Sequence, residues 1–185
     1  AHTFATFVKS SPQGLEQFTI SWLPVRLPVR PGKLFPEAGR NYGLHETLDL
    51  FNTGKQELAL WGPFEIQPSW YCEALAHKQV LDGGGVDFLT LDRGPFLRRA
   101  PVRRPDISHC VHAVTRSNEQ LRIASSPILG YGEYITRKVA DKIDEVGLLV
   151  NPCVTHDWLL PALALERYPF HRHHLGESAL KVLRD

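Results

Sequence analysis

The sequence predicts an α+β domain with a small, mostly antiparallel sheet packed against helices. Short segments with a strand pattern and longer segments with a helical pattern are mixed along the 185 residues. They lack the regular strand–helix alternation of a doubly wound sheet. No Gly/Ser linker, charge block or change in composition divides the chain, so we expect one globular domain over residues 1–185.

Composition and charge exclude several classes of protein. Lys and Arg number 21 and Asp and Glu 20, so the net charge of +1 gives no electrostatic case for a nucleic-acid partner. No apolar run approaches the roughly 20 residues that a transmembrane helix needs. The absence of Met fits a removed export signal or a start partway into a gene equally well, so a cytoplasmic and an exported location both stay open.

The first elements predicted are two strands. At a period of two, one face of residues 2–8 carries His2, Phe4, Thr6 and Val8, and the other carries Thr3, Ala5 and Phe7. Residues 18–22 alternate apolar and polar side chains, and residues 10–14 are rich in turn formers. We therefore expect an antiparallel hairpin. A proline-rich extended connection follows over residues 23–40.

The rest of the chain is predicted to contain helices and short strands in no regular order. Helical spacing predicts helices over residues 44–51, 69–81, 108–116, 130–146 and 155–167, and strand patterns predict strands over residues 57–66, 86–91 and 121–124. A basic loop with five arginines is expected over residues 92–105, where it could form a lid or rim. Residues 168–185 read as a polar tail that contains histidines.

Among the three cysteines, Cys110 has the position with the clearest chemical consequence. It stands at the start of the helix expected over residues 108–116, with Ser108 as a possible cap. The helix dipole and the free N–H groups there stabilise a thiolate, which predicts a lowered thiol pKa. The same N–H groups can hold an oxyanion. Cys110 is thus a candidate nucleophile, and the alternative is a small buried thiol that begins a core helix.

A cysteine nucleophile needs a base, and the nearest histidines are poorly aimed. His112 lies two residues further along the expected helix and points nearly the opposite way, and His109 also points elsewhere. We therefore expect the base from a distant segment. The first candidate is His2 on its strand, and the alternatives are His45 and His156, each near the start of an expected helix.

A metal site is a separate alternative. His109 and His112 are three residues apart and share a helical face, a workable spacing for two ligands. Cys153 or His156 would supply a third, although the sequence contains no HExxH or CxxC motif.

Two further residues are candidates for lining a pocket. Trp61 would form a stacking wall and Glu65 a polar partner, whereas the plainer interpretation is a strand that ends in a tight turn.

The segment His-Cys-Val-His-Ala-Val at residues 109–114 resembles the Asn-Cys-Glu-His-Phe-Val element of the lecithin:retinol acyltransferase-like proteins. These belong to the circularly permuted branch of the NlpC/P60 cysteine-hydrolase superfamily, in which a strand-borne histidine precedes the cysteine. The resemblance implies a papain-like core and thiol chemistry on an amide, ester or acyl group. It implies a small-molecule, peptide or lipid-like acyl substrate and no cofactor.

The resemblance assigns roles to matching positions. Cys110 corresponds to the nucleophile and His2 to the base, while His112 matches a histidine that we interpret as structural. The family orients its base with a polar residue from the next strand, where Thr19 or Ser21 stands here. Residue 109 is His rather than the family's Asn. A thiol hydrolase or acyltransferase is the resulting prediction, and a non-catalytic binding domain on the same fold is the alternative.

Overall fold

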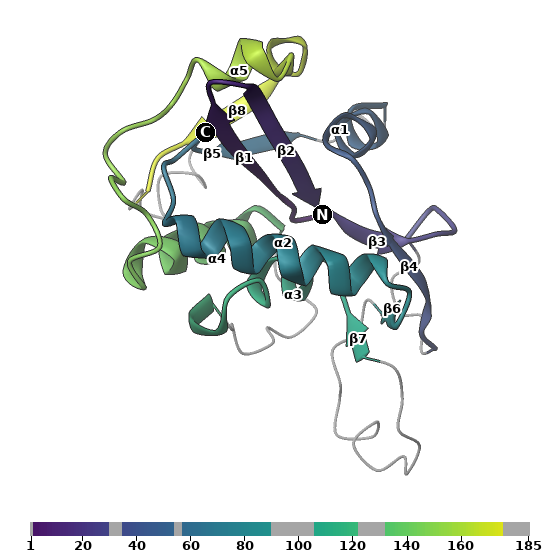
Figure 1. The fold of residues 1–185 in the computed structure, drawn as a ribbon. Helices are drawn as coiled ribbons and strands as arrows, with labels where there is room; N and C mark the ends of the chain where they lie inside the picture. The colour runs from purple at the N-terminus through teal and green to yellow at the C-terminus, as the bar shows by residue number, and fades with distance from the viewer. Residues whose placement is uncertain (1, 30–34, 54–56, 90–105, 122–131, 176–185) are drawn as a thin grey trace.

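The computed structural model describes residues 2–29, 35–53, 57–89, 106–121 and 132–175 (Figure 1). The strands are β1 (Ala5–Ser11), β2 (Gly14–Ile20), β3 (Trp22–Pro24), β4 (Glu37–Asn41), β5 (Leu58–Trp61), β6 (Val86–Phe88), β7 (Asp106–Ser108) and β8 (Phe170–His173). The helices are α1 (Leu44–Thr53), α2 (Pro68–Asp82), α3 (Cys110–Thr115), α4 (Gly132–Glu145) and α5 (Leu159–Ala162), with 3-10 turns η2 (Glu119–Leu121) and η3 (Leu165–Arg167). This mixture of helices and small sheets confirms the predicted α+β class.

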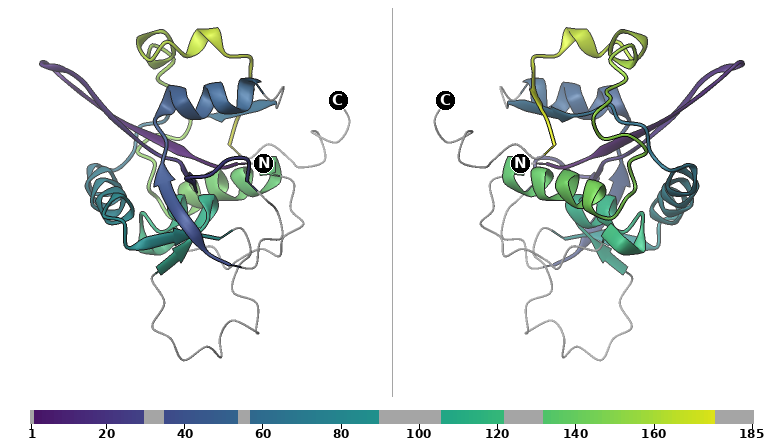
Figure 2. Two further views of the ribbon diagram at one scale, coloured as in Figure 1. Left: turned by 90° about the vertical axis from the view of Figure 1, so that its right-hand side faces the viewer. Right: turned by 90° about the vertical axis from the view of Figure 1, so that its left-hand side faces the viewer.

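Strands β1 and β2 form the antiparallel hairpin that the sequence predicted. The pairing runs from Ala5 opposite Ile20 to Ser11 opposite Gly14, so both strands extend further toward the turn than expected. Strand β1 begins only at Ala5, so the prediction that His2 lies on this strand is wrong, and His2 lies ahead of it. Gly14 has a φ of +125°, a conformation that favours glycine. Figure 2 shows the hairpin tip projecting from the body of the molecule.

The strand predicted over residues 18–22 is interrupted at Ser21. Strand β2 ends at Ile20, and β3 begins at Trp22 and pairs with a different partner, β4. Strands β3, β4, β6 and β7 form a sheet in this order, antiparallel except for the parallel pair β6 and β7. Within it, the Trp22 indole packs so closely on Gly39 that a Cβ there would lie 2.4 Å from the ring. The backbone therefore changes sheets at Ser21, between the hairpin and this second sheet.

Apolar side chains pack on both faces of the hairpin, as the period of two predicted. Phe7 belongs to a cluster with residues of α2, α3 and α4, against which Ala5 also packs. Phe4 and Val8 pack instead against a second cluster that includes Leu48 of α1. The hairpin therefore lies between α1 and α5 on one side and α2, α3 and α4 on the other (Figure 1).

Two segments that the sequence assigned to loops are strands. Strand β4 begins within the extended connection expected over residues 23–40 and ends just beyond it, and β8 lies within the expected polar tail. Strand β8 pairs in parallel with β5, from Leu58 opposite Phe170 to Trp61 opposite His173. Both predictions failed because long-range pairing, rather than local composition, makes these strands.

The helix predicted over residues 155–167 is also wrong in part. Helix α5 covers only Leu159–Ala162, and Ala164 at a φ of 51° separates it from η3. Trp158 precedes the helix, and the Asp157 carboxylate accepts a hydrogen bond from Arg172 at 2.7 Å. Leu121, expected to begin a strand, ends η2, and residues 122–124 lie outside the described part.

The remaining predicted helices are found with small changes at their ends. In the part of the chain that the structure describes, no helix is both long and apolar enough to cross a membrane. The basic loop over residues 92–105 lies outside the described residues.

Candidate functional site

Cys110 begins helix α3, close to the start that the sequence predicted. The residue before it, His109, caps the helix: its Nδ1 accepts a hydrogen bond from the His112 N–H at 3.4 Å. Ser108, the expected cap, ends β7 instead. A parallel strand that leads into the helix thus sets the position of the sulfur.

The predicted lowering of the Cys110 pKa is wrong. Burial raises the pKa of the thiol, and this effect exceeds the opposing one of the backbone N–H groups of Thr3, Val111 and Cys110 itself. Removal from water penalises the charged thiolate more than the end of a six-residue helix stabilises it. At neutral pH the resting sulfur therefore keeps its proton.

The N–H group of Thr3 joins the N-terminal segment to the candidate nucleophile. Among the backbone N–H groups that would donate a hydrogen bond to a Cys110 thiolate, the N–H of Thr3 lowers the pKa of Cys110 most. The Thr3 side chain is buried, and its hydroxyl lies 2.8 Å from the Thr136 hydroxyl of α4. Thr3 directly follows His2 in the sequence, so its N–H group brings the Cys110 sulfur next to the neighbour of the candidate base.

His2 is held in place by stacking and by one hydrogen bond. Its ring stacks on Phe4 and on Phe51, with centroids 5.9 Å and 5.1 Å away. Its Nε2 lies 2.9 Å from Ser21 Oγ. Burial lowers the pKa of His2 to about 3, so the imidazole is neutral at physiological pH.

The second nitrogen of His2 is buried without a partner. Among the described residues, which include Cys110, nothing forms a hydrogen bond with Nδ1. His77 and His156 also have a buried ring nitrogen without a hydrogen-bond partner in the described part of the chain, so the open nitrogen alone does not mark His2 as a base. Without a partner, Nδ1 of His2 stays available for a proton, a substrate or a sulfur that moves closer.

Ser21, and not Thr19, is the polar residue beside His2. The Thr19 hydroxyl lies 3.0 Å from the Thr6 hydroxyl across the hairpin. Ser21 is fully buried, and Asn41 Oδ1 accepts a hydrogen bond from its N–H at 3.2 Å. The break between β2 and β3 therefore directs the Ser21 side chain toward His2.

Thr47, which was not predicted from the sequence, extends the hydrogen bonding from His2 and Ser21 by one more side chain. Its hydroxyl donates to Ser21 Oγ at 2.8 Å, and the residue is fully buried. Thr47 lies on the face of α1 that also carries Leu44 and Phe51. A hydroxyl among apolar residues at helical spacing was the signal that could have revealed it.

The alternative bases lie in other surroundings. His45 Nδ1 is 3.3 Å from the Tyr168 hydroxyl, and the two rings stack. His156 lies 4.0 Å from Glu65, and its backbone N–H donates to Pro63. The structure therefore brings neither residue into the group formed by His2, Ser21 and Thr47.

The predicted metal site is not formed. His109 and His112 stack with ring centroids 3.9 Å apart. Across the described ranges, however, no three His, Cys, Asp or Glu side chains are grouped so that they could hold a metal ion. His156 contacts Glu65 instead, and Cys153 is exposed.

The two residues predicted to line a pocket, Trp61 in β5 and Glu65 after it, contact other side chains of the fold. Trp61 stacks on His173 of β8 with centroids 4.7 Å apart, while Glu65 lies near His156. These contacts hold β5, β8 and the following turn together.

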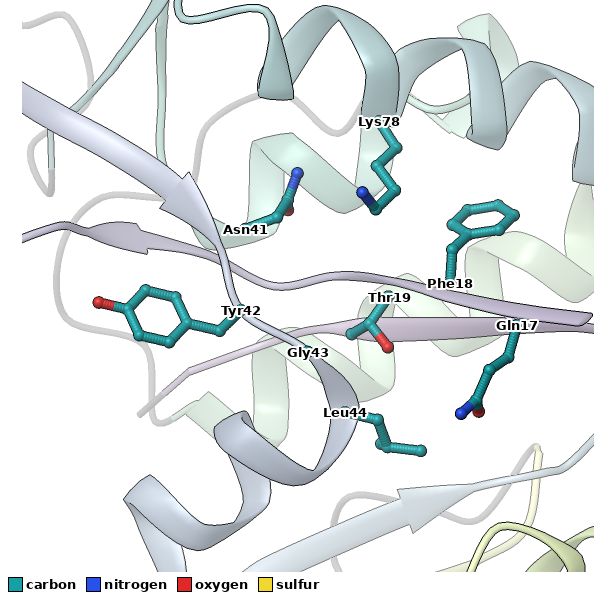
Figure 3. A pocket seen from close by; sticks show the side chains of 8 residues that line it. All are labelled: Gln17, Phe18, Thr19, Asn41, Tyr42, Gly43, Leu44 and Lys78. Atoms are coloured by element: carbon teal, nitrogen blue, oxygen red, sulfur yellow. The ribbon is translucent and has the colours of Figure 1, made fainter.

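A hollow of about 300 Å³ lies where β2, β4, α1 and α2 meet. Figure 3 shows the side chains that line it. The hollow is lined by Gln17, Phe18, Thr19, Asn41, Tyr42, Gly43, Leu44 and Lys78. Asn41 and Lys78 both bind Asp82, so the positive charge in the wall is paired. His2, Ser21 and Cys110 are not in the lining, which places this hollow beside the candidate site and not at its centre.

Comparison with known proteins gives no relative: the sequence matches no family model and no curated protein, and the structure matches no solved structure.

Proposed function

We propose that this protein is a thiol-dependent hydrolase or acyltransferase that acts on an amide, ester or acyl substrate. Cys110 is the nucleophile, His2 is the base and Ser21 orients the base. The resemblance of residues 109–114 to the lecithin:retinol acyltransferase-like element suggests the same assignment.

The observation that carries the proposal is the arrangement around His2. One imidazole nitrogen is held by a buried serine at 2.9 Å, and the other is buried and unpartnered. The next residue, Thr3, directs its N–H toward the Cys110 sulfur. A base needs one nitrogen fixed and one nitrogen open, within reach of the nucleophile in the reacting complex.

The reaction has two steps. In the first, the Cys110 sulfur bonds to the carbonyl carbon as the bond to the leaving group breaks. His2 takes the thiol proton and passes it to the leaving nitrogen or oxygen. In the second, water or another acyl acceptor attacks the thioester, and its proton returns through His2 to the sulfur. Because thiol and imidazole are both neutral at rest, the proton moves as the carbonyl is attacked rather than beforehand.

A second candidate function is a non-catalytic binding domain with the same arrangement of residues. The raised pKa of Cys110 and the lowered pKa of His2 favour it, since both oppose a thiolate–imidazolium pair.

Trapping an acyl-enzyme tests the proposal. The chain is treated with p-nitrophenyl acetate and with an acyl thioester, and intact mass and peptide mass spectrometry locate the acyl group. A Cys72→Ser/Cys153→Ser variant removes the two exposed thiols and leaves Cys110 as the remaining one. We expect one hydroxylamine-labile acyl group on Cys110 in this variant and none after a further Cys110→Ala change. A folded protein whose Cys110 is never acylated would establish the binding domain instead.

The pH dependence of iodoacetamide labelling separates the two candidates further. Since burial raises the pKa of Cys110, its unassisted labelling is slow at neutral pH and rises only above the usual range of a free thiol. If the protein is an enzyme, acyl-like reagents that occupy the site label Cys110 faster than iodoacetamide does. The His2→Gln change then removes this gain in rate. A binding domain shows the slow labelling alone.

A further inference from the structure

Arg137 of helix α4 is a buried charged residue without a counter-charge. It is 7% exposed and is the only charged residue that is buried in the described ranges. Its Nη2 atom is buried and has no hydrogen-bond partner there, and none of the ion pairs between described residues includes Arg137. Arginine stays protonated in proteins, so a full positive charge lies inside the molecule.

This charge distinguishes Arg137 from the other residues that have a buried polar atom without a partner in the described part. Those residues can all be neutral, because they are three histidines and two tryptophans: His2, His77, His156, Trp22 and Trp61. Burying an unpaired charge costs far more than burying an unpaired neutral N–H, and buried charges in proteins are paired. Arg137 therefore indicates an anion that the described residues do not supply.

The arginines nearer the surface show the opposite arrangement. Arg172 donates to both carboxylate oxygens of Asp157, at 2.8 Å and 2.7 Å, and Arg40 pairs with Glu46. Carboxylates thus stand beside arginines where solvent already screens the charge, and no described carboxylate stands beside the buried one. A guanidinium kept only for stability would need the reverse arrangement. The burial of Arg137 is better explained by a ligand.

Arg137 lies on the part of α4 that approaches the candidate nucleophile. The hydroxyl of the preceding residue, Thr136, lies 2.8 Å from the Thr3 hydroxyl. The Thr3 N–H in turn lies at the Cys110 sulfur. The charge of Arg137 does not contribute to the pKa of Cys110, so the guanidinium is not an immediate neighbour of the sulfur. An anion bound by Arg137 is therefore near the candidate site but remote from the reacting atoms.

A carboxylate is the anion that suits Arg137 best. The guanidinium presents two parallel N–H donors that match the two oxygens of a carboxylate. One guanidinium also balances one carboxylate, whereas a phosphate group carries about 1.5 to 2 negative charges at neutral pH. His2 and Cys110 are neutral at rest and add no positive charge that could balance the excess.

We propose that Arg137 binds a carboxylate of the ligand that occupies the Cys110 site. The substrate is then an acyl compound or peptide with a free carboxylate away from the bond that breaks. The identity of the ligand as a substrate rests on the proposed function, but carboxylate binding by Arg137 does not depend on catalysis.

Thermal unfolding of the full chain measures carboxylate binding. The probes are N-acetylglycine, its uncharged amide N-acetylglycinamide and inorganic phosphate, at one ionic strength. We expect N-acetylglycine alone to raise the Tm of the wild type, because a ligand that binds only the folded state stabilises it. The rise should be lost in Arg137→Met and kept in the matched control Arg172→Met. No rise, a rise that persists in Arg137→Met, or a larger rise with phosphate overturns the inference.

The stability of the protein without ligand gives a second measurement. Methionine keeps most of the length and the apolar stem of arginine and removes the charge. Arg137→Met should therefore have a higher Tm than the wild type when no anion is added, because replacing a buried unpaired charge by an apolar side chain is stabilising. A lower Tm, or a variant that does not fold, would show that the chain itself pairs the guanidinium and would overturn the proposal.

Acylation of Cys110 tests the substrate class. In the Cys72→Ser/Cys153→Ser variant, 4-nitrophenyl hydrogen adipate is compared with 4-nitrophenyl hexanoate, which has the same chain length and no carboxylate. A charge-assisted hydrogen bond predicts a preference for the adipate of roughly 10–100-fold. Arg137→Met should abolish this preference and Arg172→Met should keep it. Equal rates with both esters in the parent variant contradict the assignment of the substrate class.

The outcomes separate this site from the proposed function. A Tm rise with N-acetylglycine that needs Arg137, without any acylation of Cys110, leaves the carboxylate site standing and removes the enzyme. Acylation at equal rates from both esters, without a Tm rise, leaves the enzyme standing and removes the carboxylate site.

Discussion

Helix α1 contributes to two polar networks from opposite faces, and the difference between them is instructive. Thr47 is directed toward Ser21 and His2, whereas His45 and Asp49 are directed toward Tyr168. Both networks contain a histidine beside a hydroxyl, so local composition does not distinguish them.

The network at Tyr168 is complete. The phenol donates to Asp49 Oδ1 at 2.7 Å and accepts from Arg167 at 2.7 Å, and His45 Nδ1 lies 3.3 Å away. The network at His2 contains no charged partner among the described residues and leaves Nδ1 unpaired. A complete network contributes stability, whereas a buried group without a partner needs a separate explanation, for which we propose the catalytic role of His2.

The largest expected effect is on catalysis. His2→Gln should slow acylation of Cys110 by about 10²–10⁴-fold, the usual contribution of a general base. His45→Gln, the matched change in the other network, should leave the rate within about twofold. The rates are measured with the variant that lacks Cys72 and Cys153. A larger loss in His45→Gln would assign the base to the Tyr168 network.

Acid stability is expected to depend on His2. Its pKa falls from 6.5 to about 3 on folding, so between these values the unfolded chain binds more protons than the folded one. Stability is therefore full above pH 6.5 and is lost as the pH falls toward 3, by at most about 1.4 kcal/mol per pH unit. Urea unfolding at a series of pH values measures the slope. His2→Gln should flatten it, and an unchanged slope would show that the buried imidazole is not responsible.

A smaller effect is expected at the complete network. Tyr168→Phe removes the hydroxyl that joins His45, Asp49 and Arg167, and should cost about 1–3 kcal/mol of unfolding free energy. Acylation of Cys110 should not change, because no hydrogen bond links Tyr168 to His2 among the described residues. A stable Tyr168→Phe variant with slowed acylation would contradict the separation of the two networks.

The smallest effect is expected at Thr19. Its hydroxyl pairs with Thr6 across the hairpin, so Thr19→Val should cost about 0.2–1 kcal/mol. Acylation should stay unchanged, in contrast to Ser21→Ala. Thermal unfolding and acylation rates measured side by side give both numbers, and a catalytic loss in Thr19→Val would reassign the partner of His2.

Local pattern was enough to predict the hairpin, its two faces and the helix that begins near Cys110. Alternation placed Phe4 and Phe7 on opposite sides, and the structure confirms it. The catalytic roles of Cys110 and His2 remain predictions. The fold does bring the N–H of Thr3, the residue after His2, to the Cys110 sulfur.

Long-range effects explain what the sequence did not reveal. Strand β4 has the sequence EAGRN, which lacks strand formers and pairs because β3 and β6 lie on either side of it. The thiol pKa rises because burial outweighs the helix dipole, and burial is a property of the whole fold. The choice of Ser21 over Thr19 followed from a break between strands that alternation alone cannot locate.

The parallel pair of β5 and β8 has a consequence for folding during synthesis. The backbone of Leu58 in β5 pairs with that of Phe170, which is synthesised more than a hundred residues later. The hairpin of β1 and β2, in contrast, can form as soon as Ile20 has left the ribosome. Until β8 is synthesised, the edge of β5 that it will pair with stays open to other chains, so the nascent protein carries an aggregation-prone strand while the segment between them is made.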